Sequence, residues 1–315
     1  MIIFRPIEIV VADIMVVWHT VLTWLGLAPE SGAAWALSIV GLVVTIRIIL
    51  VPLFVKQIKA SRAMQMIAPE LKAVQAKYKG KKDQASREAM SRETMELYSK
   101  HKTNPFASCL PMLVQAPIFF ALFRVLNYEI GPDSAGIGWL TPTLAAQADS
   151  ATIFGAPLSA TFLEEGSSMT VKIVAAALIV AMVATTFLTQ RQLTRKNMPA
   201  SALEGPMAQQ QKVLMYILPF IFVISGPNFP IGVLIYWTTT NLWTMGQQFY
   251  VIRRNPTPGS DAEKTYKARL AAKAAKKGVP LIDSSNPDHL VIEADEAGET
   301  GGQREQPKKK PRKKR

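Results

Sequence analysis

One arginine lies inside a long apolar segment. Residues 35–55 form a run of about twenty mostly apolar side chains, and Arg47 is in its second half. A helix of that length crosses a hydrocarbon core of roughly 30 Å. A guanidinium there costs on the order of 2.5–3.5 kcal/mol unless it faces protein or a water-filled cavity. Arg47 therefore predicts a path for a substrate or an ion, and the alternative is an arginine whose side chain merely reaches the membrane surface.

Polar side chains recur at helical spacing in two other apolar segments. One face of 171–190 carries Thr186, Thr189 and Gln190, and one face of 231–251 carries Trp237, Asn241, Thr244 and Gln248. Hydrogen bonds between packed helices would satisfy such groups in hydrocarbon. If the two faces converge with Gln115 and Arg47, they line a hydrated cavity instead. The candidate cavity residues are Arg47, Gln115, Thr186, Gln190, Trp237 and Asn241.

Five apolar segments within 31–253 position these residues. The predicted spans are 35–55, 108–127, 171–190, 213–226 and 231–251. Residues 1–30 add a further apolar helix, which either spans the membrane or lies on its surface. The predicted fold is an all-α polytopic membrane protein with a five-span core bundle.

The charges between the segments orient the bundle. Residues 56–107 hold twelve Lys and Arg against five Asp and Glu, whereas the loop 128–170 holds five acidic residues and no Lys or Arg. The positive-inside rule places the first stretch in the cytoplasm and the second outside. Arg253 and Arg254 end the last span on the inner side, so the C-terminus is predicted to be cytoplasmic.

The cytoplasmic stretch 56–107 has the pattern of an antiparallel helical hairpin. A seam of apolar residues steps by three and four, and Gly80 interrupts it before a second helical arm. Methionines give the hairpin a soft apolar surface that suits varied partners, and simple packing between the arms is the alternative. The candidate residues for recruiting substrates are Met64, Ile67, Leu71, Met90 and Met95.

Residues 254–315 form a tail that is predicted to be mostly disordered, although Ala268 to Ala275 could become helical on a partner. Its end is strongly basic. Cations on a flexible chain bind phosphates by counterion release, which points to ribosomal RNA, and the alternative partner is anionic lipid. The candidate contact residues are Lys308, Lys309, Lys310, Arg312, Lys313, Lys314 and Arg315.

Composition excludes several classes of protein. The net charge of +13 favours polyanionic partners. The single cysteine, Cys109, cannot form an internal disulfide, and three scattered histidines suggest no metal site. The sequence contains no nucleotide-binding motif, so neither a cofactor nor an enzymatic activity is expected.

Three blocks of the chain resemble the YidC family of membrane protein insertases. The first is Thr45-Ile-Arg47-Ile-Ile-Leu-Val-Pro52-Leu53 with the basic helix that follows. The second runs from Asn104-Pro105-Phe106 through Pro111 to Gln115-Ala-Pro117. The third contains Pro206-Met207, Leu234-Ile-Tyr236-Trp237 and Asn241-Leu242. The blocks cover about residues 34–253 in order, and the short outer loop is similar to actinobacterial-type members.

The resemblance implies a polar groove that is open to the cytoplasm and to lipid and closed outside. Arg47 matches the family's groove arginine, and Gln190 and Trp237 match groove-lining positions. Family members move hydrophobic segments of nascent proteins into the bilayer, alone or with the Sec translocon, and receive them from ribosomes. The resemblance thus implies a chaperone-like insertase in the bacterial cell membrane, with nascent membrane proteins as substrates.

Two other classes of protein fit part of the sequence. A small anion transporter could use Arg47 as its site, but transporters usually contain internal repeats with paired broken helices, and the sequence shows no such repeat. A membrane-anchored RNA-binding protein would explain the basic tail, but it leaves the arginine and the polar faces without a role.

Overall fold

The computed structural model describes residues 4–81, 83–104, 110–131, 133–198 and 206–277. The chain divides into two compact units, Met1–Tyr266 and Lys267–Arg315. Eleven α-helices lie within the described residues: α1 (Arg5–Trp24), α2 (Gly32–Ile49), α3 (Val51–Met66), α4 (Ala68–Lys77), α5 (Gln84–Lys100), α6 (Leu110–Arg124), α7 (Pro142–Ser150), α8 (Met169–Lys196), α9 (Pro206–Ser225), α10 (Ile231–Arg254) and α11 (Asp261–Lys277). A two-stranded antiparallel ribbon joins β1 (Thr152–Ile153) to β2 (Ala156–Pro157). The predicted all-α class is confirmed.

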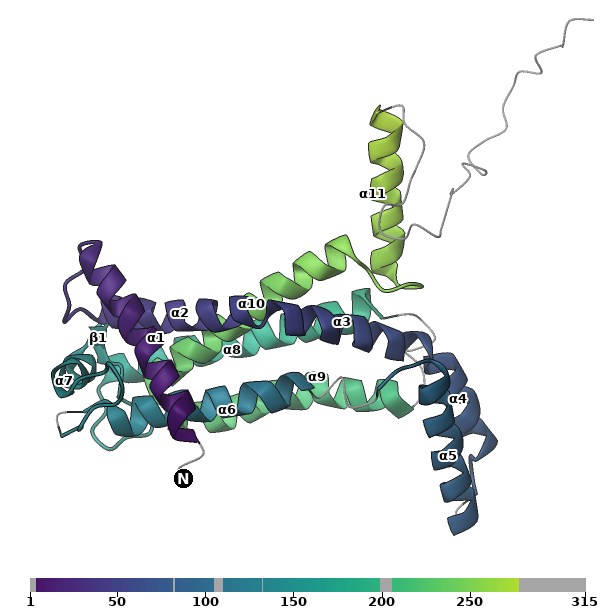
Figure 1. Ribbon diagram of the computed structural model, residues 1–315, viewed down its shortest axis with the longest axis horizontal. Helices are drawn as coiled ribbons and strands as arrows, with labels where there is room; N and C mark the ends of the chain where they lie inside the picture. Colours follow the sequence, from purple (N-terminus) through teal and green to yellow (C-terminus); the bar gives the residue numbers. More distant parts are fainter. Residues whose placement is uncertain (1–3, 82, 105–109, 132, 199–205, 278–315) are drawn as a thin grey trace, which may run out of the picture. The chain divides into compact units, whose positions relative to one another are not determined.

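Long helices pack side by side in the first unit (Figure 1). Helix α8 packs against α9 and α10, and α10 also packs against α2. The bundle has two ends, which we name by their contents. The loop end carries α7 and the β1–β2 ribbon, and the hairpin end carries α4 and α5.

Proline divides the first long apolar segment. Helix α2 ends at Ile49, Leu50 caps it, and α3 begins at Val51 with Pro52 in its first turn. Proline has no N–H and its ring crowds the carbonyl of the preceding turn, so it is tolerated at a helix start and not in an interior. The predicted span 35–55 therefore consists of α2 and the beginning of α3, with Arg47 in the last turn of α2.

Three helices are long and apolar enough to cross a membrane by length and composition, namely α1, α2 and α8. The other three predicted spans coincide with α6, α9 and α10, whose length or composition differs from that of α1, α2 and α8. Helix α6 has 15 residues before a π-helical turn (Val125–Glu129), α9 begins with the polar stretch 209–212, and α10 carries many Thr, Asn and Gln side chains. The division of the chain into five spans stays a prediction.

Helix α1 crosses α2 obliquely and does not run alongside it (Figure 1). Trp18 lies on Gly41 of α2, where an added Cβ would be 2.4 Å from the indole ring. The Trp18 indole N–H also donates to the Thr45 hydroxyl at 2.9 Å. At the other end of α1, Arg5 pairs with Glu129 of the π-helical turn at 2.5 Å. The helix thus bridges α2 and the end of α6.

The predicted hairpin is present as α4 and α5. The turn contains Gly80 at φ +88°, and the Asp83 carboxylate accepts the Ser86 N–H at 2.8 Å, which caps α5. Ile67 and Leu71 are buried, Met64 and Met90 are half-buried, and Met95 is exposed. Lys77 and Tyr78 donate hydrogen bonds to Glu93, and these bonds, led by that from Lys77, hold the pKa of Glu93 below its usual value.

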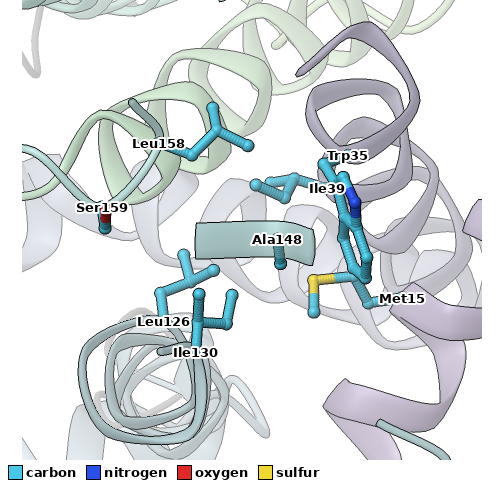
Figure 2. Close-up of a pocket in the computed structure, with 8 residues that line it drawn as sticks. All are labelled: Met15, Trp35, Ile39, Leu126, Ile130, Ala148, Leu158 and Ser159. Carbon is cyan, nitrogen blue, oxygen red and sulfur yellow. The ribbon is translucent and has the colours of Figure 1, made fainter. Parts of the chain in front are cut away.

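The loop end contains the main apolar core. Trp35, Ile39, Leu122, Leu140 and Ile231, from different parts of the first unit, are at most 1% exposed. Figure 2 shows a cavity of only about 10 Å³ within this core, lined by Met15, Trp35, Ile39, Leu126, Ile130, Ala148, Leu158 and Ser159. That is about the smallest space that admits a water, and its lining offers few polar partners. This end of the bundle is therefore tightly packed.

The tail begins as an ordered segment, which differs from the prediction of disorder after residue 254. The Thr257 N–H donates to the Asn197 side chain at the end of α8 at 3.0 Å, and Ser260 is buried. The Ser260 hydroxyl then caps α11 by accepting the Glu263 N–H. This capping and the Ala-rich composition favour a helix from Asp261 to Lys277. Residues 278–315, with the basic run, lie outside the described part of the chain.

Candidate functional site

Arg47 is buried near the middle of the first unit. It is 7% exposed, and its guanidinium carbon lies 5.1 Å from the centre of the Phe54 ring. Among the residues that the structure describes, no carboxylate forms an ion pair with it. A cation–π contact offsets part of the cost of burying the charge, but it is weaker than an opposite charge in a dry site. Arg47 can therefore still accept an anionic partner.

Two further helices bring polar groups to this arginine. Tyr236 of α10 is 3% exposed and lies within electrostatic range of Arg47. The Gln115 amide of α6 donates to the Tyr236 hydroxyl at 2.5 Å. Gln115 is thus hydrogen-bonded to a tyrosine that lies within electrostatic range of Arg47, and we name these three residues the arginine cluster.

A second group of polar residues lines a cavity between α8, α9 and α10. The cavity has a volume of about 160 Å³, and its lining residues are Thr186, Thr189, Gln190, Phe222, Asn241 and Thr244. The Asn241 amide donates to the Thr186 hydroxyl at 3.0 Å and to the Met182 carbonyl at 3.3 Å. The Thr189 and Thr244 hydroxyls donate to carbonyls of their own helices, so their oxygens can still accept bonds. We name this space the threonine cavity.

Helix α10 separates the two groups. Tyr236 faces α2 and α6, whereas Asn241 faces α8. Five residues turn a helix by about 140° beyond a full circle, so the two side chains point in different directions. The described contacts thus place Gln115 with Tyr236 on one side of α10, and Thr186 with Asn241 on another.

Trp237 belongs to neither polar group. Its ring packs against Phe119, Phe222 and Phe229 at centroid distances of 4.9, 4.8 and 5.7 Å. Phe222 also lines the threonine cavity, so the aromatic cluster meets that space at this one ring. The tryptophan is next to the cavity, and the polar atoms of the lining come from other residues.

Sequence reasoning missed two features of this region. Tyr236 was not a candidate because a tyrosine in an apolar run is ordinary, and only its contact with Gln115 reveals a role. The second is an ion pair between Glu8 of α1 and Arg124 of α6, with Nε and Oε1 2.6 Å apart. The signal was two opposite charges inside apolar segments, which would each be costly if unpaired.

Most of the chain matches a known family of proteins. A family model described as "60Kd inner membrane protein" matches residues 26–258. Proteins named "Membrane protein insertase YidC" are similar to this chain. The one from Tropheryma whipplei (strain Twist) is 40% identical over 283 residues, which cover 87% of this chain and 91% of the relative. The chain belongs to the YidC family of membrane protein insertases.

Two other members of the YidC family are similar to this chain in sequence. The member from Streptomyces avermitilis is 48% identical over 85% of this chain, which spans 62% of that relative's length. The member from Bifidobacterium longum is 34% identical over 99% of this chain and 95% of its own length. One solved structure, of an active YidC insertase with its first transmembrane domain resolved, aligns with 69% of this chain and 41% of its own at 24% identity and a TM-score of 0.42. YidC membership and the apolar helices identify this chain as an integral membrane protein.

Proposed function

We propose that this YidC-family chain moves hydrophobic segments of nascent membrane proteins from the cytoplasm into the bilayer. The observation that carries the proposal is Arg47, a buried cation without a carboxylate partner among the described residues. It lies over the Phe54 ring and within electrostatic range of Tyr236. The arginine attracts acidic groups in the translocated part of a substrate, and lipid then takes up the apolar segment. Because no covalent bond is made or broken, the activity is not enzymatic.

We infer that the loop end faces outside and the hairpin end faces the cytoplasm of a bacterial cell. The stretch 56–107 is strongly basic and the loop 128–170 contains no Lys or Arg, as the positive-inside rule requires of the two sides. In this orientation the packed apolar core is on the outer side. The threonine cavity is towards the inner ends of α8 and α10. This arrangement supports a protein in which water and the polar segments of a substrate enter the bundle only from the cytoplasmic side.

Helix α1 lies across the outer part of this bundle and does not form a sixth parallel span. Its long apolar run would permit a span, but Arg5, Glu8 and Asp13 each contact groups in or next to the outer loop. A helix that spanned independently would leave these charges in hydrocarbon without partners.

Photo-crosslinking tests the function directly. A crosslinking amino acid at Gln190 or Asn241 in the full chain, reconstituted in vesicles, should label a nascent single-span protein during its insertion. The same group at Leu242, which is 49% exposed on the same helix, should label lipid instead. Labelling of the nascent chain that is equal at all three positions would reject a route through the threonine cavity.

Cysteine labelling should show that the threonine cavity is open on one side. In a Cys109→Ala background, single cysteines at Gln190 and Asn241 should react with a membrane-impermeant thiol reagent added from the cytoplasmic side and not from outside. A cysteine at Trp237 should react more slowly because its ring is packed among phenylalanines. Ala121→Cys, at a position with 0% exposure, is the unreactive control. Labelling from outside would indicate a pore.

The basic tail and the hairpin 56–107 are the proposed contacts with partners. We assign Met64, Ile67, Leu71, Met90 and Met95 to substrate recruitment, although Ile67 and Leu71 are buried and contribute mainly to packing. The tail binds ribosomal RNA in this proposal, anionic lipid is its competing partner, and the Sec translocon cooperates with the core.

Truncation after Lys277 should separate tail binding from insertion. This cut keeps Thr257, Ser260 and α11, so the ordered base of the tail remains intact. In detergent, the truncated protein should lose affinity for empty ribosomes, while post-translational insertion of short substrates persists. The full chain's affinity should fall by about a thousandfold between 50 and 200 mM salt if roughly six phosphates are neutralised. Equal binding by both proteins in detergent at low salt would leave ribosome contact to the hairpin.

A further inference from the structure

A cluster of four charges joins α1 to the end of α6. The Arg124 Nε donates to the Glu8 carboxylate at 2.6 Å, and the Arg124 guanidinium lies 5.6 Å from the centre of the Tyr128 ring. Arg5 approaches the same carboxylate at 3.5 Å and pairs with Glu129 at 2.5 Å. The cluster lies at the loop end, away from the arginine cluster and the threonine cavity, and neither of these sites uses it.

The members of this charge cluster differ in burial. The Glu8 side chain is 1% exposed and that of Arg124 is 34% exposed, whereas that of Arg5 is 47% exposed. An exposed ion pair contributes little because water competes for both charges. Removing one partner of a buried pair leaves an uncompensated charge and is strongly destabilising. The Glu8–Arg124 pair is therefore the least solvent-screened of the described ion pairs that join α1 to the end of α6.

Arg124 is the last residue of α6, so its ion pair can affect the position of residues earlier in that helix, including Gln115. A π-helical turn begins at Val125, directly after Arg124, so regular α-helical geometry does not continue past this point. Gln115 lies nine residues before Arg124, or about 14 Å along the helix at 1.5 Å per residue. The residues between include Ala121 and Leu122, which are both 0% exposed. A shift of the helix end would therefore disturb the outer core and the Gln115–Tyr236 bond.

We propose that Glu8 and Arg124 are positioning residues for insertion. Their ion pair holds α1 across the loop end of α6, keeps water out of the outer core, and fixes Gln115 against Tyr236 beside Arg47. The inference rests on the proposed function, because it takes the loop end as the outer side. A second attachment supports the same role, since the Asp13 carboxylate accepts the Trp139 backbone N–H at 2.6 Å one and a half turns along α1.

A thiol reporter in the outer core tests the proposal. The full chain carries Cys109→Ala and Ala121→Cys, is reconstituted in vesicles, and receives an impermeant maleimide from outside. Glu8→Gln or Arg124→Gln should each raise the labelling rate at least about tenfold. Arg124→Gln leaves the buried Glu8 carboxylate with only the more distant Arg5, and Glu8→Gln leaves the half-buried Arg124 without its carboxylate. The double variant should label more slowly than either single variant, since it removes both charges. Glu30→Gln, the same chemical change at an exposed position, should label like the parent.

The outcomes discriminate between this inference and the proposed function. Single variants that label no faster than the parent, or a double variant that labels faster than both, would overturn the inference. If a single variant does not reconstitute, Glu8→Asp replaces it, and its shorter carboxylate should give intermediate labelling. A cysteine at Asn241 should still react from the cytoplasmic side in every variant. Loss of that reaction in the parent would reject the threonine cavity and leave the outer ion pair untouched.

Discussion

Arg47→Ala should reduce the insertion of substrates with acidic translocated tails to background. At an effective dielectric constant of about 20, two unit charges 4 Å apart attract by roughly 4 kcal/mol. Loss of even half of this attraction slows a step by more than about tenfold. Alanine also removes the cation that lies over the Phe54 ring. Insertion rates of purified variants in vesicles measure the effect.

Two comparisons make the Arg47 result specific. Arg47→Lys should retain part of the activity because the charge remains, although the planar guanidinium is lost. Arg191→Ala removes an exposed arginine next to Gln190 and should insert substrates at the parent rate. Substrates without acidic residues in the translocated tail should be affected less by Arg47→Ala. A well-folded alanine variant that inserts acidic tails at the parent rate would contradict the proposed role of Arg47.

Gly32→Ala should cause a large loss of stability, because its added Cβ would make the shortest contact among the described glycines. A Cβ at Gly32 would lie 1.9 Å from the Thr152 carbonyl oxygen and 2.3 Å from its carbon. Both atoms belong to the backbone of β1, so the start of α2 and the β1–β2 ribbon must separate to make room. Overpacking of this kind typically lowers the free energy of unfolding by about 1–3 kcal/mol. A clash with backbone atoms is expected at the upper end of that range. The melting temperature in detergent should fall by several degrees.

Gly246→Ala is the matched control for Gly32→Ala. Gly246 lies in α10, is exposed, and has no heavy atom within 4 Å of an added Cβ. Alanine is the better helix former by roughly 0.5–1 kcal/mol, so this variant should melt at the parent temperature or slightly above. A Gly32→Ala protein that melts together with the control would mean that the ribbon does not press against α2.

The sequence alone determined the helical class, and the resemblance of three sequence blocks indicated the family. It also predicted a role for Arg47. The helical class and this prediction follow from local composition, because apolar length and a single charge within it can be read without knowing which helices are neighbours. The hairpin was also predictable, since Gly80 and Asp83 provide a turn and a helix cap within a few residues. The helical tendency of Ala268 to Ala275 was predicted only for a partner-bound tail. The ordered segment before it was not predicted, because the buried contact of Thr257 with Asn197 spans sixty residues of sequence.

Only the tertiary structure decided which polar residues contact one another. Helical periodicity shows that Thr186 and Asn241 each lie on a polar face, but it does not show which face meets which helix. The rotation of α10 directs Tyr236 towards Gln115 and Arg47, and it directs Asn241 towards Thr186. The pairing of Glu8 with Arg124 likewise needed the tertiary structure, because each charge can be seen in its apolar segment but 116 residues separate the two partners. Packing between helices sets these contacts, and that packing depends on the whole bundle at once.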